Sequence, residues 1–156
     1  MKLGRVLLGA GILAAAVIAG FFVLIRVPAF QDFAFRRITQ SIVGQTHAEL
    51  FDDRALRVLV CGSSSPIADP ARAKACIAVI AGGQYYLVDV GPESYRNLAL
   101  WRIPGEKIGG VFLTHLHSDH IGELGEVNLN TWGLGRPHPL KVYGPPGVED
   151  VVAGFS

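Results

Sequence analysis

The stretch FLTHLHSDHIGEL, residues 112–124, is the feature that most limits what this chain can fold into. It places three histidines and an aspartate within six positions, directly after an apolar run. Side chains two apart on an extended strand point the same way, so His115 and His117 are expected to project to one side. Asp119 and His120 follow at the turn and offer a carboxylate and a further imidazole. Because zinc prefers such nitrogen and oxygen ligands, the pattern predicts a metal site rather than an ordinary polar loop.

Short runs rich in apolar and β-branched residues surround this stretch, separated by glycine, proline and serine. They predict an α/β domain with strands and helices interspersed along the chain. Strands are expected at 56–62, 75–83, 84–91, 108–115 and 139–144, with a hairpin at Gly82-Gly83. Helices are expected at 92–103 and 145–155, and a short helix or irregular turn at 121–130.

An uncharged run of twenty residues, Val6 to Ile25, precedes this domain. At ~1.5 Å per residue it matches the ~30 Å hydrocarbon layer, so residues 1–27 are predicted to be a membrane anchor with a transmembrane helix. A cleaved leader and a buried soluble helix are the alternatives. The short basic tail before the run favours a single-pass protein whose domain lies on the periplasmic or extracytoplasmic side. Residues 28–55 are expected to form a connector.

The charge balance limits the partners expected for the domain. Residues 47–156 contain nine Lys/Arg and twelve Asp/Glu, with no basic stripe. We therefore expect nucleic acid to be an unlikely partner. The two cysteines, Cys61 and Cys76, exclude a disulfide framework. A single bridge is possible in an exported domain, but we expect both to be small buried residues in strands.

The segment THLHSDHIGEL resembles the signature of the metallo-β-lactamase superfamily of metal-dependent hydrolases. Around it, LVCGSSSPIADPARAKA, YLVDVGPES and PLKVYGPPGVEDVV are similar to segments of the branch that includes ribonuclease Z and arylsulfatase-like enzymes. The resemblance covers residues 56–156. It implies the N-terminal half of an αββα sandwich, with the C-terminal half and its remaining metal ligands beyond Ser156. The coding frame is therefore expected to be incomplete.

The resemblance also implies roles for individual residues. His115 and His117 would bind the first of two divalent metal ions, expected to be zinc, and Asp119 and His120 would bind the second. Asp119 is in addition the catalytic candidate, placed to handle a proton, and a hydroxide shared by the two ions would be the nucleophile. His138 is the only later histidine and is not expected to be a ligand.

Three more residues are candidates from the flanking segments. Gly62 and Ser65 fit the loop after the first strand, although Ser64 stands where the family has its second glycine. Asp89, two residues before Gly91, is expected either to hold a metal-binding histidine or to cap a turn.

The function implied is hydrolysis of a phosphodiester, a sulfate ester or another small ester or lactone, so a small-molecule ester is the expected substrate. One alternative is an RNA endonuclease like ribonuclease Z. Another is a truncated metal-binding or redox protein without hydrolase activity. The 156-residue chain alone is expected to be inactive, and its sequence predicts no oligomeric state.

Overall fold

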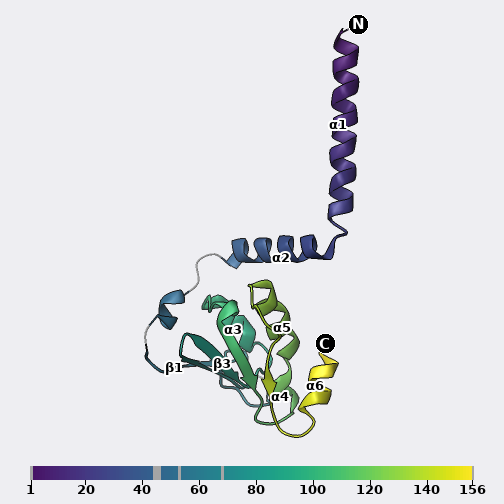
Figure 1. Ribbon diagram of the computed structural model, residues 1–156. Helices are drawn as coiled ribbons and strands as arrows, with labels where there is room; N and C mark the ends of the chain where they lie inside the picture. The colour runs from purple at the N-terminus through teal and green to yellow at the C-terminus, as the bar shows by residue number, and fades with distance from the viewer. Residues whose placement is uncertain (1, 44–46, 53, 68, 156) are drawn as a thin grey trace. The chain divides into compact units, whose positions relative to one another are not determined.

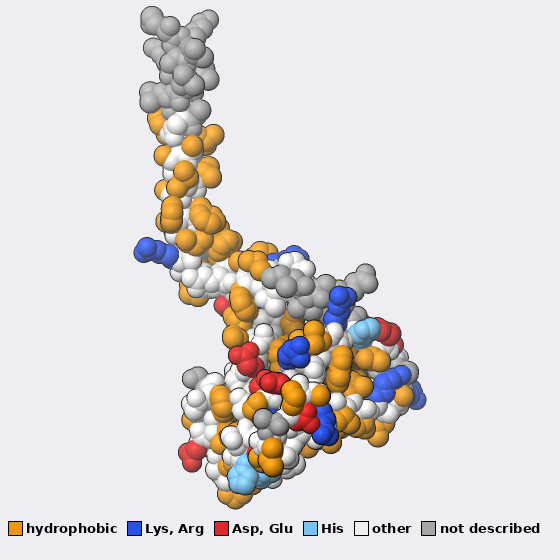
Figure 2. Space-filling view, turned by 180° about the vertical axis from the view of Figure 1, so that it is seen from behind, with side chains coloured by type: hydrophobic (Ala, Val, Ile, Leu, Met, Phe, Trp, Pro, Cys, Tyr) orange, Lys and Arg blue, Asp and Glu red, His pale blue; other side chains and the backbone are white. Residues whose placement is uncertain are grey.

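A computed structural model describes residues 2–43, 47–52, 54–67 and 69–155, without the side chains of residues 2–8, 10, 40, 42, 43 and 48. The chain divides into two compact units, Met1–Ile38 and Thr39–Ser156. Helix α1 (Lys2–Leu24) and the start of helix α2 (Pro28–Val43) belong to the first unit. The described part of α1 carries exposed apolar side chains such as Ile12, Val17 and Phe21 (Figure 2).

The predicted transmembrane helix at residues 6–25 is not borne out. In the described part of the chain no single helix has both the length and the apolarity to cross a bilayer. Gly11–Leu24 passes that test only together with Pro28–Thr39, and the two are bent by 90°. The predicted single-pass membrane localisation, and the membrane as a partner, are therefore wrong.

A five-stranded mixed sheet forms the centre of the second unit (Figure 1). Its strands, in sheet order, are β1 (Arg57–Gly62), β2 (Cys76–Ala81), β3 (Gln84–Val88), β4 (Ile108–Phe112) and β5 (Val142–Tyr143). The first three are antiparallel neighbours, whereas β4 runs parallel to β3 and to β5. Gly82 and Gly83 both have positive φ, as the predicted hairpin requires.

Short helices connect the strands. Helix α3 (Ser94–Leu100) lies in the crossover between β3 and β4, as parallel strands require. The pair α4 (Ser118–Ile121) and α5 (Leu124–Gly133) follows β4. The remaining helical segments are η1 (Ala48–Phe51), η2 (Gly105–Lys107) and α6 (Val148–Gly154).

The core lies between one face of the sheet and the helices. The strands contribute Ala78, Leu87 and Val111 to this core. The helices contribute Leu98 of α3 and Val127 of α5. The opposite face of the sheet also carries apolar side chains, but these are exposed: Val58, Val60, Ile77, Phe112 and Tyr143. The predicted α/β architecture is thus confirmed.

Two cysteines in neighbouring strands form a disulfide. Cys61 of β1 and Cys76 of β2 are both buried, as expected, and their Cα atoms lie 5.0 Å apart. The β1–β2 register shifts between Val60 and Gly62, so Cys61 lies in an irregularity beside Cys76. The expectation of two unpaired apolar residues is therefore corrected in favour of the single bridge.

Candidate metal-binding edge of the sheet

The residues of the motif lie where two parallel strands end. Because β3 and β4 are parallel neighbours, Asp89 after β3 and Thr114 after β4 come to the same edge of the sheet. The Asp89 N–H donates to the carbonyl oxygen of Phe112 at 2.9 Å, which carries the pairing one residue past β3. The edge therefore brings together two segments that are 25 residues apart in sequence.

Asp89 is the centre of a buried hydrogen-bond network. Its Oδ1 accepts from the backbone N–H of Thr114 at 2.8 Å, and its Oδ2 accepts from Thr114 Oγ1 at 2.8 Å. The same Oδ2 accepts from His120 Nδ1 at 2.7 Å. Since a carboxylate has no proton to give, Nδ1 carries the hydrogen in this contact, which in the neutral ring leaves the lone pair on Nε2. Asp89 thus holds a histidine of the motif, and the metal-binding part of its first expected role stays a prediction.

The backbone around Asp89 is shaped for this contact. Asp89 is 5% exposed and has a φ of 60°, a left-handed conformation that aspartate adopts more readily than most residues. Gly91, two residues on, lies so close to the segment after β4 that an added Cβ would be 2.1 Å from the carbonyl oxygen of Asp119. Only glycine allows this approach.

The three imidazoles of the motif lie together. The ring centroids of His115 and His117 are 4.7 Å apart, and those of His115 and His120 are 3.8 Å apart. Asp119 is 8% exposed, and its Oδ2 lies 3.5 Å from His120 Nε2. His117 precedes α4, and its carbonyl oxygen accepts from the backbone of His120 at 2.9 Å.

Whether these residues can bind a metal ion depends on the type and the number of their ligand atoms. Imidazole nitrogens and a buried carboxylate are the donors that zinc prefers. In the neutral His120 ring, the Nε2 lone pair is available for one bond to a metal ion. Among the described residues, however, no group of three or more His, Cys, Asp or Glu is arranged to hold an ion. Metal binding by these four residues stays a prediction.

The loop after β1 is held by contacts with the residues that precede β2. An added Cβ on Gly62 would lie 1.6 Å from the carbonyl oxygen of Lys74, so glycine is required there by the neighbouring chain. The Lys74 ammonium donates to the carbonyl oxygens of Ser65, Pro66 and Ile67 at 2.7, 3.2 and 2.8 Å. It also lies 3.3 Å from Ser64 Oγ. Ser65 thus contributes a backbone oxygen to a loop held by Lys74.

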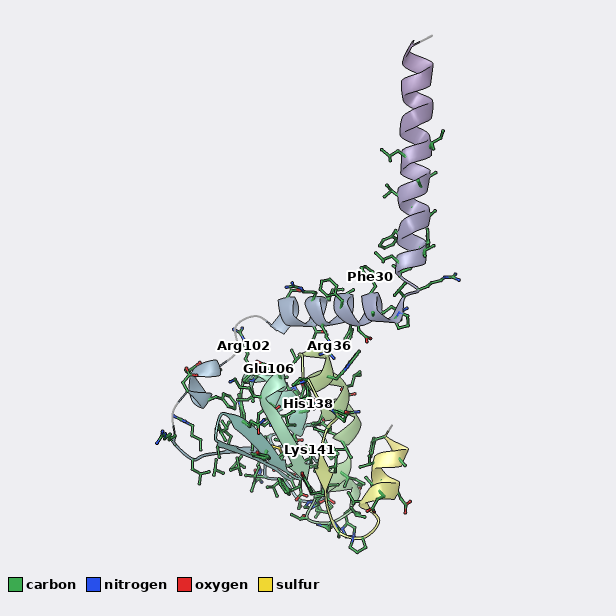
Figure 3. The ribbon with its side chains drawn as sticks, in the orientation of Figure 1. Phe30, Arg36, Arg102, Glu106, His138 and Lys141 are labelled. Carbon is green, nitrogen blue, oxygen red and sulfur yellow. A yellow bond between two sulfur atoms is a disulfide. The ribbon has the colours of Figure 1, made fainter. Side chains whose placement is uncertain are left out.

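His138 lies elsewhere. It lines a cavity of about 180 Å³ with Glu106 and Lys141, near the residues that begin β3 and β4 (Figure 3). The motif follows the other ends of these strands. The structure therefore places His138 at the opposite edge of the sheet.

Two residues of this edge were missed by sequence reasoning. Thr114 belongs to the motif segment, but its hydroxyl had no assigned role. Glu123 lies three residues after His120, and its carboxylate accepts from the backbone N–H groups of Glu93 and Tyr95, both at 2.5 Å. No local pattern marks this contact, because its partners are 28 and 30 residues away.

A family model for the metallo-beta-lactamase superfamily matches residues 69–153, which is more than half of the chain. The chain belongs to this superfamily. The resemblance drawn from THLHSDHIGEL is thereby confirmed, and members of the superfamily generally bind divalent metal ions, typically zinc.

Individual relatives agree with this assignment. Ribonuclease Z of Mycobacterium marinum is 42% identical over 100 residues, which are 62% of this chain and 36% of that protein. The metallo-beta-lactamase fold protein YhfI from Bacillus subtilis is 28% identical with a TM-score of 0.54, covering 61% of this chain and 40% of that one. The short form of human tRNase Z is 26% identical with a TM-score of 0.55, and the match covers 62% of this chain and 38% of that one. The chain thus spans well under half the length of these relatives.

These relatives correct one expectation. We expected nucleic acid to be an unlikely partner, but several similar proteins carry the name ribonuclease Z, so that expectation is wrong. The charge count was a poor guide because the 100 matched residues are only 36% of such a protein. The net charge of one segment of a protein does not predict the charge of a binding surface formed by its other segments.

Proposed function

We propose that this chain supplies half of the metal site of a hydrolase that cleaves phosphodiester bonds in RNA, in the manner of ribonuclease Z. The observation that carries the proposal is the 42% identity to ribonuclease Z over 100 residues. The superfamily match at residues 69–153 contains both the motif and Asp89. The network around Asp89 supports the proposal, because a histidine fixed through Nδ1 presents Nε2 in one direction.

In this proposal His115 and His117 hold one divalent ion, and Asp119 and His120 hold the other. Bound ions of this kind polarise a phosphoryl oxygen and lower the pKa of water. The chain's own residues contribute orientation and proton handling. Asp89 fixes the His120 ring, and Asp119, buried beside it, is the proton acceptor. Thr114 completes the support by binding both oxygens of Asp89.

The substrate test compares RNA with small esters on protein produced from the native gene. The substrates are a transfer RNA precursor with a 3′ extension, bis(4-nitrophenyl) phosphate and 4-nitrophenyl esters. Cleavage of the RNA precursor is expected. Hydrolysis of the small esters without RNA cleavage would refute this proposal and support the small-ester alternative. No hydrolysis of any substrate by the metal-loaded protein would refute the hydrolase itself.

The ligand assignment is tested separately by metal analysis. His115→Ala or His117→Ala should remove one ion per chain, since each histidine is one of few protein ligands to it. Asp119→Ala should lower turnover by several orders of magnitude, because the second ion and the proton acceptor are lost together. The matched control is His138→Ala, which should keep both ions. Two ions and full activity in His115→Ala would show that the ligands are wrongly chosen.

A further inference from the structure

Glu123 makes a contact that its own helix does not explain. It precedes α5 in the N-cap position, yet its side chain does not cap that helix. Instead Oε1 accepts from the Glu93 N–H at 2.5 Å, and Oε2 accepts from the Tyr95 N–H at 2.5 Å. Ser94 Oγ, which is fully buried, lies 3.4 Å from Oε2. The carboxylate thus binds the first turn of α3.

This contact replaces a cap that α3 lacks. Glu93, in the N-cap position of α3, has a φ of 68° and makes no capping bond with its own side chain. The unpaired N–H groups at a helix start favour a negative charge, and bonds from N–H groups to a carboxylate are among the stronger ones. Glu123 therefore fixes residues 93–95 from another part of the chain.

The same two segments are also joined closer to the motif. The Glu123 N–H donates to the carbonyl oxygen of Val90 at 2.9 Å, and the Val90 N–H donates to the carbonyl oxygen of His120 at 2.7 Å. Val90 directly follows Asp89, whose carboxylate holds the His120 ring. One continuous set of bonds therefore runs from the first turn of α3 through Glu123 and Val90 to Asp89 and His120.

We propose that Glu123 is a positioning residue, which holds the turn at Asp89 against the segment after β4 and so fixes the orientation of the His120 imidazole. As a statement about metal binding this rests on the proposed function. As a statement about the His120 ring it does not, because the bond from His120 Nδ1 to Asp89 joins two residues of this chain.

The first experiment reads the His120 ring in metal-free protein. Long-range ¹H–¹⁵N spectra, recorded at a pH well above the range in which histidine is protonated, report which nitrogen carries the hydrogen. The native protein should show His120 as a single Nδ1–H form. Glu123→Ala should give a mixture of the two forms or an exchange-broadened signal. Glu123→Gln, which keeps one acceptor oxygen, should lie between the two.

Two further variants serve as references. Asp89→Ala removes both acceptor oxygens at this position, so its spectrum marks complete loss of the preference for the Nδ1–H form. Glu126→Ala is the matched control, since Glu126 is exposed on α5 and binds the Asn130 side chain within that helix. Each variant is used only after urea unfolding shows a cooperative transition. A Glu123→Ala protein that is folded and keeps the native His120 signal overturns the proposal.

The second experiment titrates Co²⁺ or Zn²⁺ into the same variants. Partners that orient metal ligands are worth about 10–100-fold in metal affinity, so Glu123→Ala should weaken binding about tenfold and Glu126→Ala should not. Unchanged affinity in Glu123→Ala refutes the role in metal binding. If the native protein binds no metal, the proposed function fails, and the His120 spectra still decide whether Glu123 positions the ring.

Discussion

The disulfide between Cys61 and Cys76 should account for a large part of the stability of the second unit. The bridge joins residues 15 apart in sequence. Closing a loop of that length removes conformational entropy from the unfolded chain worth about 3 kcal/mol at 25 °C. Net stabilities of domains are only about 5–15 kcal/mol, so the double variant Cys61→Ala/Cys76→Ala should remain folded but be clearly less stable.

Urea unfolding measures this effect directly. With a slope of about 1–3 kcal/mol/M for a small domain, the midpoint should fall by roughly 1–3 M in the double variant. A reducing agent should lower the midpoint of the native protein by a similar amount and leave the double variant unchanged. Equal midpoints for the native and double-variant proteins, or two titratable thiols in the unreduced native protein, would refute the reasoning.

The buried tyrosines Tyr85 and Tyr95, and the loop lysine Lys74, give two further predictions about stability. Burial raises the pKa of Tyr95 to about 12 and raises that of Tyr85 further, so the fold favours their neutral forms. The stability that Tyr95 contributes should be fully present below the unfolded pKa of about 10 and be lost as the pH rises through about 12, and that of Tyr85 should be lost at higher pH. Tyrosine absorbance and circular dichroism should then change together, and ionisation near pH 10 with the fold intact would contradict this. Lys74→Met should cost about 1–3 kcal/mol, because the ammonium no longer holds the carbonyl oxygens of residues 65–67. Faster proteolysis of that loop should accompany the loss, and unchanged stability and proteolysis would contradict the role given to Lys74.

The strands were predictable because local pattern alone determines them. Apolar runs bounded by glycine and proline correspond to β1 to β4, and Gly82-Gly83 to the observed hairpin. Boundaries were less accurate where the backbone departs from regular geometry. The helix expected from residue 92 begins at Ser94, because Glu93 has a left-handed φ. The strand expected at 139–144 is reduced to Val142–Tyr143, the part that pairs with β4.

In the candidate site, too, some features were predictable from the local sequence and others depended on the fold. His115, His117, Asp119 and His120 were identifiable because they fall within six consecutive positions. The role of Asp89 was left open between holding a histidine and capping a turn, because its partners depend on which strand lies beside β3. Only the parallel pairing of β3 with β4 places Thr114 and His120 next to it.

Glu123 shows why part of such a site has no signal in the sequence. As a residue type it does not differ from Glu126, three positions later in the same helical segment. The difference arises because the crossover through α3 returns the chain to the sheet beside β3, which brings the start of α3 against the end of the motif segment. Glu123 faces those N–H groups and Glu126 does not bind them in the described contacts. Candidate metal ligands can therefore be proposed from a short motif, whereas the residues that would hold those ligands in place depend on the fold.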